Sequence, residues 1–176
     1  FDRGSELGIN LIDTAECYGD HLSERLIGDY LSRRDRSRWI VATKFGHHFN
    51  RFMDRTPDFS AASVRRQLED SLRALRVDVI DVYQFHSGAD DLFLNDELWA
   101  ELAALKQSGK VRHLGVSILS KGSELQAREA RRMGAEMLQV VYNRLDRRPE
   151  ELYFPHATRD QLGVFARVAL ASGLLS

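Results

Sequence analysis

The sequence predicts a parallel α/β protein, and three observations support this fold class. Segments with strand character alternate with amphipathic segments along the whole chain, which is the pattern of β-α-β units. Several strand segments are continuously apolar and rich in Val and Ile, as strands that are covered on both faces are. No Pro-, Gly- or Ser-rich linker divides the 176 residues, so we expect a single domain over residues 1–176.

Six short segments have strand character, and most of them end close to a polar residue. In chain order they are Ile9–Asp13, Ile40–Lys44, Val79–His86, His113–Ser117, Met137–Tyr142 and Gly163–Val168. The segments that lie between them are amphipathic and are predicted to be helical: Ser23–Arg33, Ser60–Leu75, Asn95–Ser108, Lys121–Met133 and Arg148–Leu162. The chain also begins, at Phe1, in what has the character of a helix end.

The second of these helices has the clearest pattern. Its apolar residues recur every three or four positions and form one helical face: Val64, Leu68, Leu72 and Leu75. Ser60 precedes this run and is the expected N-cap. Gly109 and Gly134 stand where two later helices should end, because glycine is common just after a helix.

Two arrangements of these units remain open from the pattern alone. A doubly wound nucleotide-binding sheet is favoured by a G-x-G-x-x-G motif after the first strand, and the sequence has neither this motif nor a Walker phosphate loop. An α/β barrel has eight strands and about 250 residues. The six strand segments found here fall short of that number.

Composition excludes several classes of partner. The formal net charge of −1 gives no electrostatic reason to expect nucleic acid or an anionic membrane surface. No run approaches the roughly 18 apolar residues of a membrane span, and no signal-peptide pattern is present. The single cysteine, Cys17, cannot form an internal disulfide, which favours a reducing compartment. We therefore expect a cytoplasmic protein.

The first three strand segments each deliver a side chain suited to proton transfer. Asp13 ends the first segment and Tyr18 follows it closely, Lys44 ends the second, and His86 ends the third. In an α/β barrel the C-terminal strand ends converge on the face where catalysis takes place. Each of these residues alone is compatible with a structural role, such as a turn cap or a surface strand end, but together they predict an active site.

The chemistry of these four groups is complementary. A tyrosine whose pKa is about 10 is a weak acid at neutral pH, and we expect the ammonium group of Lys44 to lower the pKa of Tyr18. Asp13 would hold Lys44 in place as an ion pair. His86 can donate a hydrogen bond to a carbonyl oxygen. The set is suited to protonating an oxygen while another group supplies a hydride to carbon.

Ordered motifs along the chain resemble those of the aldo-keto reductase superfamily, from the first strand segment to the last residues. The motifs are G-I-N-L-I-D-T-A-E-C-Y-G, S-E-R-L-I-G, A-T-K-F-G, D-V-Y-Q-F-H, G-K-V-R-H-L-G-V-S (Gly109–Ser117), L-Q-V-V-Y-N (Leu138–Asn143) and A-L-A-S-G-L-L (Ala169–Leu175).

The resemblance implies a (β/α)8 TIM barrel that reduces an aldehyde or ketone with NADPH, or with NADH, and without a metal ion. On this basis Tyr18 is the general acid, Lys44 tunes it, Asp13 pairs with Lys44, and His86 orients the substrate carbonyl. The expected partner is a small carbonyl or alcohol substrate, and nothing in the sequence indicates an oligomeric state.

The resemblance also implies residues that hold the cofactor. Ser117 and Gln139 match positions that bind the nicotinamide carboxamide. Arg167 stands where an aromatic side chain usually stacks on the nicotinamide ring, and a guanidinium plane can stack there too. The positions near the pyrophosphate correspond to Leu170 and Ser172.

The barrel is expected to be incomplete over residues 1–176, with about six βα units present and the first and last strands missing. We expect the native protein to be longer, since a six-strand piece leaves two sheet edges unpaired. Two alternatives remain open: a cofactor-binding sensor or regulatory subunit without catalysis, and an inactive fragment.

Residues after the second strand are expected to form a loop that leads to the next helix. Two adjacent histidines in this loop, His47 and His48, either face the solvent or line the mouth of the substrate site together with Phe45, Phe49 and Phe52.

Overall fold

The computed structural model describes residues 1–51, 54–122 and 124–176. Six parallel strands form one curved sheet in the order β1-β2-β5-β6-β7-β8, so neighbours in the sheet follow one another along the chain. The strands are β1 (Leu11–Asp13), β2 (Ile40–Phe45), β5 (Ile80–His86), β6 (Val111–Ser117), β7 (Met137–Val141) and β8 (Gly163–Arg167). The six expected strands are thereby confirmed, with boundaries that differ by one or two residues.

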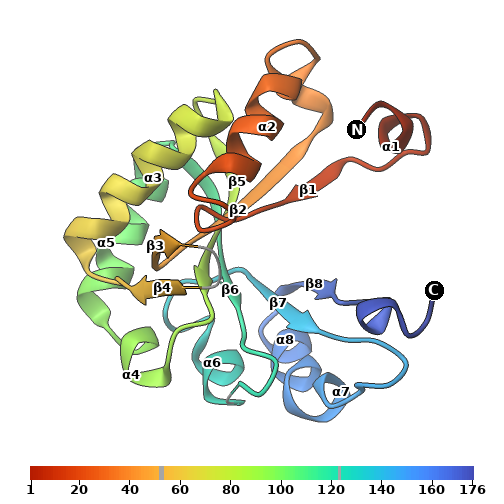
Figure 1. The fold of residues 1–176 in the computed structure, drawn as a ribbon. Coiled ribbons are helices and arrows are strands. Elements are labelled where there is room, and N and C mark those ends of the chain that lie inside the picture. Colours follow the sequence, from red (N-terminus) through yellow and green to blue (C-terminus); the bar gives the residue numbers. More distant parts are fainter. Residues whose placement is uncertain (52–53, 123) are drawn as a thin grey trace.

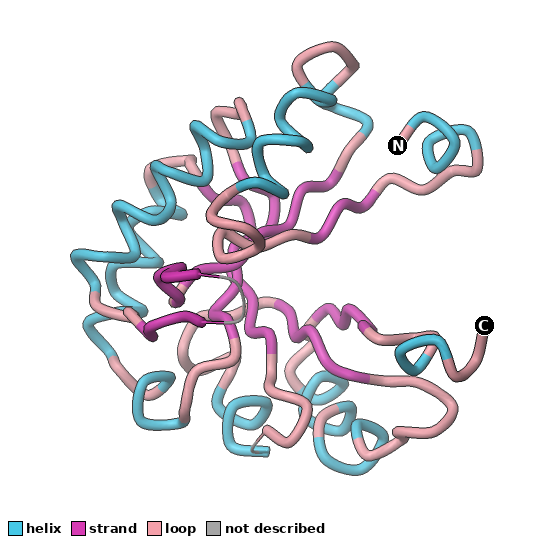
Figure 2. The backbone as a smooth tube through the Cα atoms, in the orientation of Figure 1, coloured by secondary structure: helices cyan, strands magenta, loops and turns pink. Residues whose placement is uncertain are grey.

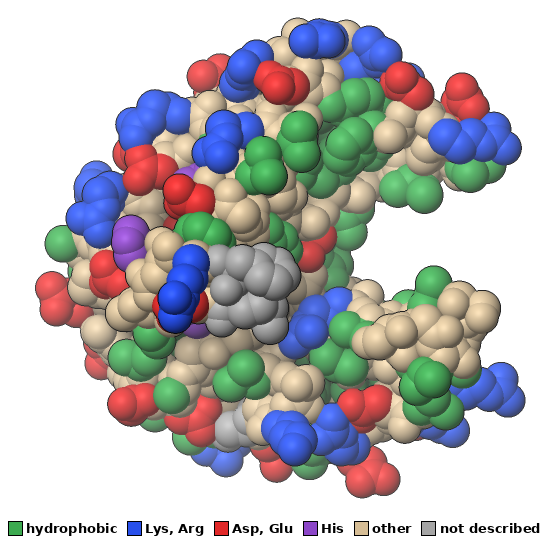
Figure 3. Space-filling model, in the orientation of Figure 1, with side chains coloured by type: hydrophobic (Ala, Val, Ile, Leu, Met, Phe, Trp, Pro, Cys, Tyr) green, Lys and Arg blue, Asp and Glu red, His purple; other side chains and the backbone are tan. Residues whose placement is uncertain are grey.

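The sheet curls into half of a barrel. Figures 1 and 2 show a C-shaped molecule in which β1 and β8 border the opening, and the two termini lie on opposite sides of it. The same opening is a deep notch in the space-filling view, where hydrophobic side chains gather along the side nearest to the N-terminus (Figure 3). This architecture confirms the expected incomplete barrel.

Helices cover the outer, convex side of the sheet (Figure 1). They are α2 (Leu22–Leu31), α3 (Ala61–Leu75), α4 (Asp90–Phe93), α5 (Asp96–Gln107), α6 (Glu124–Glu129), α7 (Pro149–Leu152) and α8 (Phe154–Arg159). The short helix α1 (Asp2–Glu6) lies instead at the N-terminal tip of the molecule, before β1 (Figure 1). Short 3-10 turns occupy Arg36–Arg38 and Ala171–Gly173. Within the described ranges, no helix is long and apolar enough to cross a membrane.

Helix boundaries follow the local chemistry of the sequence. The Ser60 side chain accepts a hydrogen bond from the backbone N–H of Ser63, so the expected N-cap of α3 is confirmed. The helix expected over Arg148–Leu162 is instead split into α7 and α8. Pro155 explains the break, because it has no N–H with which to continue the hydrogen bonding of α7.

An antiparallel hairpin replaces the loop that was expected after β2. It consists of β3 (His47–Arg51) and β4 (Asp54–Pro57), and Phe49 lies opposite Arg55. The prediction of a plain loop is wrong because both strands are polar and short, without the alternation of apolar residues that marks a half-buried strand. The hairpin stands beside the C-terminal ends of the central strands (Figure 1).

Alternate residues of the central strands point to opposite faces of the sheet, as the period of two requires. The outward-facing residues pack with the helices in the main hydrophobic core, which includes Val41, Phe45, Tyr83, Phe85, Val116 and Leu138. A second, small cluster formed by Ala42, Val82 and Met137 lies on the inner face, with Leu11 and Phe165 packed against it. The next inner positions toward the C-terminal strand ends are polar.

Helices α2 and α3 approach each other closely at Gly28. A Cβ atom at this position would lie 2.4 Å from the backbone oxygen of Ala74 and 2.9 Å from that of Leu75. Real Cβ atoms do not approach a backbone oxygen that closely, so only glycine permits this contact. The packing of α2 on α3 therefore depends on the missing side chain.

A buried carboxyl group holds the start of the hairpin against the loop after β1. Oε1 of Glu16 accepts hydrogen bonds from the backbone N–H groups of Gly46, at 2.8 Å, and His47, at 3.0 Å. Burial raises the pKa of Glu16 to about 8, although these two hydrogen bonds favour the ionised form. At neutral pH the folded protein therefore holds a proton that the unfolded chain releases.

We predict that Gly28→Ala lowers the free energy of unfolding by about 1–3 kcal/mol, because the new methyl group overpacks the contact between α2 and α3. Alanine is intrinsically the better helix former, so propensity alone predicts the opposite sign. Gly4→Ala in α1 is the matched control, since its Cβ would meet only ordinary contacts at 3.8 Å. Urea denaturation of both variants measures the difference, and a stabilised Gly28→Ala protein would contradict the packing argument.

We predict that Glu16→Gln gains stability over the parent chain as pH rises from about 4.5 to about 8. In this window the folded state of the parent keeps the Glu16 proton and the unfolded state does not. Unfolding of the parent therefore releases a proton, and rising pH favours unfolding. For each pH unit in this window, the folding equilibrium constant of Glu16→Gln rises by up to about tenfold relative to that of the parent.

Glutamine keeps an oxygen that accepts from Gly46 and His47, which isolates the effect of the charge. Unfolding of the parent, of Glu16→Gln and of the exposed-site control Glu6→Gln would be compared at both ends of the window. A difference between parent and Glu16→Gln that does not change with pH would show that Glu16 is ionised in the folded protein.

Candidate active site

The parallel register brings polar side chains from neighbouring strands into two inner layers. Lys44 on β2 is paired with Gln84 on β5. One layer closer to the strand ends, His86 is paired with Ser117 on β6, and Ser117 with Gln139 on β7. Residues far apart in the sequence therefore lie side by side at the C-terminal edge of the sheet.

An ion pair lies at the centre of this edge. Nζ of Lys44 donates to Oδ2 of Asp13 at 2.7 Å and to the backbone oxygen of Thr14 at 2.6 Å. The Lys44 side chain is 1% exposed, and burial lowers its pKa, although the charge of Asp13 opposes this. The Gln84 amide donates to the other Asp13 oxygen at 3.2 Å. The position of the ammonium group is thus fixed by three residues.

Tyr18 reaches the same place from the loop between β1 and α2. Nζ of Lys44 lies 5.3 Å from the centroid of its ring, and the ring of His86 lies 6.0 Å away, edge-on. Tyr18 is 43% exposed, so its phenol group is accessible from the cavity that it lines. The structure therefore brings together Tyr18, Lys44 and His86 as expected.

The expected lowering of the pKa of Tyr18 is wrong. Partial burial raises the pKa of this phenol, and the negative charge of Asp13 raises it further, while Arg167 and Arg55 oppose the effect. The main physical reason is burial, which disfavours the phenolate, and the Asp13 carboxylate beside Lys44 adds to it. The phenol therefore stays protonated throughout the neutral range.

His86 is buried and uncharged at neutral pH. Burial lowers its pKa well below 6.5, and the nearby positive charges of Lys44 and Arg55 contribute. Its Nδ1 lies 3.7 Å from Sγ of Cys17, a thiol whose pKa is raised by burial. A protonated thiol can donate to Nδ1, and this arrangement leaves the proton of the neutral ring on Nε2.

A cavity of about 460 Å³ opens over these groups. Its described lining consists of Tyr18, Lys44, His47, Arg55, Pro57, His86, Ser87, Ser117, Leu119, Gln139 and Arg167. Ser117 donates to Oε1 of Gln139 at 3.1 Å, and Nη2 of Arg167 donates to the backbone oxygen of Ile118 at 3.1 Å. Three of the five expected cofactor residues thus share the cavity with Tyr18 and His86.

The remaining two expected cofactor residues lie elsewhere. Leu170 and Ser172 follow β8 in an exposed segment, and neither is among the described residues that line the cavity. Ser172 has a left-handed backbone conformation, with φ of 57°. Their expected contact with a pyrophosphate stays a prediction.

The expected mouth residues separate into different environments. His47 lines the cavity, and its Nε2 lies 2.7 Å from the backbone oxygen of His86. Phe45 is instead fully buried in the main core, and His48 and Phe49 line a different cavity. Phe52 lies outside the described residues. The prediction for Phe45 is wrong because this residue still belongs to β2. Side chains alternate along the strand, and Phe45 points to the outer face of the sheet.

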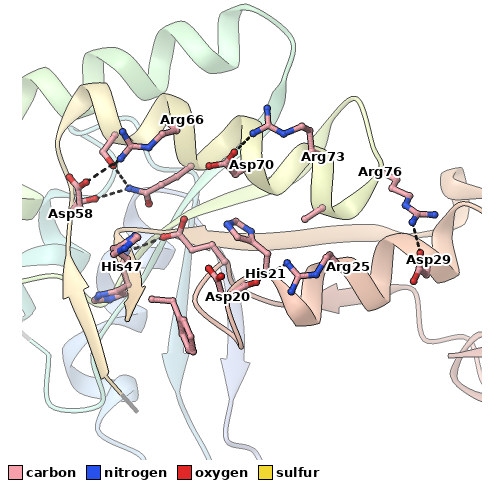
Figure 4. A pocket seen from close by; sticks show the side chains of 16 residues that line it. Asp20, His21, Arg25, Asp29, His47, Asp58, Arg66, Asp70, Arg73 and Arg76 are labelled. Carbon is pink, nitrogen blue, oxygen red and sulfur yellow. Dashed lines mark hydrogen bonds and ion pairs between the residues drawn. The ribbon is translucent and has the colours of Figure 1, made fainter. Parts of the chain in front are cut away.

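That other cavity, of about 680 Å³, lies on the outer side between α2, α3 and the hairpin (Figure 4). It is larger than the cavity over Tyr18, but none of Tyr18, Lys44 and His86 lines it. Much of its charge is internally paired: Arg66 with Asp58, Arg73 with Asp70, and Arg76 with Asp29. Among the described residues, no three His, Cys, Asp or Glu side chains are grouped so as to hold a metal ion.

Three residues of the site were missed by sequence reasoning. Gln84 fixes Asp13, Cys17 contacts His86, and Arg55 extends from the hairpin into the lining of the cavity. A signal for Gln84 was available, because it is a polar residue within an otherwise apolar strand and two positions before His86. The sequence contains no comparable signal for Arg55, whose position depends on the hairpin.

Comparisons with known proteins find oxidoreductases of similar sequence. The uncharacterized oxidoreductase YqkF of Bacillus subtilis is 34% identical over 99% of this chain and 56% of its own length. The NADH-specific methylglyoxal reductase of Escherichia coli is 32% identical over 96% of this chain and 55% of its own length. The chain therefore spans about half the length of the curated relatives that it matches.

Solved structures give the same result. The holo form of an aldo-keto reductase from Bacillus halodurans is similar with a TM-score of 0.90 and 36% identity, over 99% of this chain and 57% of its own. An aldo/keto reductase from Klebsiella pneumoniae in complex with NADP and acetate reaches a TM-score of 0.78 at 27% identity, over 98% of this chain and 57% of its own. The model of the aldo/keto reductase family matches residues 2–176, and the chain belongs to that family.

Proposed function

We propose that this chain carries the proton-transfer centre of an NADPH-dependent oxidoreductase, with NADH as a possible alternative, that reduces an aldehyde or ketone to an alcohol. The observation that supports this most directly is the shared cavity of Tyr18, Lys44 and His86, with Asp13 bound to Lys44. In the reaction the C=O double bond becomes a single bond, the carbon gains a hydride, and the oxygen gains a proton.

Tyr18 is the proposed proton donor. Its raised pKa keeps the phenol protonated at neutral pH, so the proton is present when charge develops on the carbonyl oxygen. Lys44 is a fixed positive charge close to the phenol ring, and it would stabilise the phenolate that remains after the transfer. Asp13 and Gln84 act through Lys44, as positioning residues.

His86 is the proposed carbonyl-binding residue. A neutral imidazole that accepts from the thiol of Cys17 at Nδ1 presents an N–H at Nε2. This N–H can donate to the carbonyl oxygen without competing with Tyr18 as the acid. Two donors, the Tyr18 phenol and the His86 imidazole, would then converge on one oxygen.

Residues on β6, β7 and β8 are suited to a nicotinamide. The hydrogen bond from Ser117 uses the carbonyl oxygen of Gln139 and leaves its NH2 group for a carboxamide oxygen. Within the described chain, Nε of Arg167 is buried and has no hydrogen-bond partner, which is compatible with a group placed against the guanidinium. A nicotinamide bound here would supply the hydride. The choice of NADPH over NADH is a prediction, since the relatives include an NADP complex and an NADH-specific enzyme.

We predict that Tyr18→Phe lowers kcat for carbonyl reduction by about 100- to 10,000-fold, because the general acid is lost. Binding of NADPH, followed by quenching of protein fluorescence, should remain near the level of the parent. Tyr142→Phe is the matched control, because Tyr142 loses only a hydrogen bond to Glu150 outside the cavity.

Unchanged turnover of Tyr18→Phe would refute the assigned role. If the parent protein binds NADPH but reduces no aldehyde or ketone, a sensor or regulatory subunit is the better assignment. If it binds no nicotinamide cofactor at all, the interpretation as an inactive fragment holds.

We predict a flat pH profile of kcat/KM for reduction across the neutral range, with a fall at alkaline pH, where Lys44 and Tyr18 lose their protons. The pKa of His86 is lowered well below 6.5, so it does not titrate in this range, and the pKa of Tyr18 is raised above 10. Reduction needs the protonated phenol, so activity is retained at low pH and lost as pH rises through the raised pKa. An inflection near neutral pH in the profile would contradict both assignments.

A further inference from the structure

The cavity that holds Tyr18 and His86 is lined by positive charge. Lys44, Arg55 and Arg167 are among its described lining residues, and none of those residues is an aspartate or glutamate. Lys44 is neutralised by Asp13, and one nitrogen of Arg167 is bound to a backbone oxygen. Arg55 has neither kind of compensation.

Arg55 lies on β4, and its side chain lines the cavity beside Pro57. Its one described hydrogen bond runs from Nη1 to Sγ of Cys17, at 3.1 Å, and sulfur is a weak acceptor. Other arginines near the hairpin differ: Arg51 is paired with Asp54 and Arg66 with Asp58. Within the described part of the chain, no carboxylate lies within ion-pair distance of Arg55.

We propose that Arg55 binds the carboxylate of the substrate, so that the enzyme acts on carbonyl compounds that carry a carboxylate a few carbons from the reacting group. This inference rests on the proposed function of the cavity. A guanidinium offers five N–H donors in a planar arrangement that matches a carboxylate, and among the described residues only one of these donors has a partner.

The contacts place this guanidinium at the reacting end of the cavity. Nη1 of Arg55 touches Cys17, and the same sulfur lies 3.7 Å from Nδ1 of His86. An anion held by Arg55 would therefore lie close to the carbonyl that His86 orients. These two contacts limit the distance between Nη1 of Arg55 and Nδ1 of His86 to about 7 Å, which one short molecule can span.

Its place in the sheet favours the substrate over the cofactor as the ligand of Arg55. The residues suited to the nicotinamide are on β6, β7 and β8, whereas the hairpin follows β2 and is separated from β6 by β5. Tyr18 and His47 line the same cavity as Arg55, and its positive charge acts on the pKa of both. An anion bound by Arg55 would therefore lie closer to the proton donor, Tyr18, than to the residues suited to the nicotinamide.

The test compares one aldehyde in two charge states: 4-oxobutanoate, which carries a carboxylate, and its methyl ester, which does not. With NADPH as the cofactor, Arg55→Gln should raise KM for 4-oxobutanoate by about 10- to 100-fold, the range of a charge-assisted hydrogen bond. KM for the methyl ester and KM for NADPH should stay unchanged. Arg55→Lys should restore part of the affinity for the acid.

Arg51→Gln is the matched control, since it removes an arginine from the same hairpin that does not line the cavity. It should leave KM for both aldehydes as in the parent. If Arg55→Gln raises KM for acid and ester equally, or raises KM for NADPH alone, the carboxylate assignment is overturned.

A binding measurement separates this inference from the proposed function. Butanoate cannot be reduced at a carbonyl group, and calorimetry should show that it binds to the parent more tightly than to Arg55→Gln, with an affinity that falls as salt is added. If butanoate binds in this way but the protein reduces neither aldehyde, the role of Arg55 in carboxylate binding is supported and the proposed reductase function is refuted. Equal butanoate binding by parent and variant would refute the role of Arg55.

Discussion

The register of the parallel sheet is the constraint on which the site depends. In each strand only every second residue faces the inside of the barrel, so a shift of one position would turn Lys44, Gln84 and His86 outward into the hydrophobic core. The observed pairing of His86 with Ser117, and of Ser117 with Gln139, sets three polar side chains in a row. Apolar packing of the opposite face, with residues such as Tyr83 and Phe85, holds this register in place.

Burial and nearby charges determine the protonation state of each group in the site. Removing an ammonium group from water costs several kcal/mol unless it is paired, and Lys44 meets this requirement with Asp13 and a backbone oxygen. Because Lys44 is paired with Asp13, its ammonium group does not lower the pKa of the neighbouring Tyr18. Burial and the Asp13 charge raise that pKa instead. The pKa of His86 is lowered, because burial disfavours the charged form of its imidazole. The result is a neutral acid and a neutral hydrogen-bond donor beside a compensated ion pair.

Much of this arrangement could be predicted from the sequence, for physical reasons. The strands are apolar runs, and residues such as Asp13, Lys44 and His86 stand out at their ends. The hairpin could not be predicted, since its polar strands carry no burial pattern. The cavity position of Arg55 was missed for the same reason. The direction of the Tyr18 pKa shift was also out of reach, because it depends on how deeply the phenol is buried and on its distance from Asp13, which the sequence does not show.

The raised pKa of Tyr18 also bears on how the proposed reaction would depend on pH in its two directions. By microscopic reversibility, a tyrosine that gives its proton to a carbonyl during reduction must, as phenolate, take the proton from an alcohol during oxidation. Burial and Asp13 make the phenolate scarce at neutral pH. The ratio of the forward and reverse rates is fixed by the equilibrium constant, so the raised pKa favours neither direction. It would instead leave reduction insensitive to pH in the neutral range, whereas oxidation at the same site would accelerate by about tenfold per pH unit up to the raised pKa.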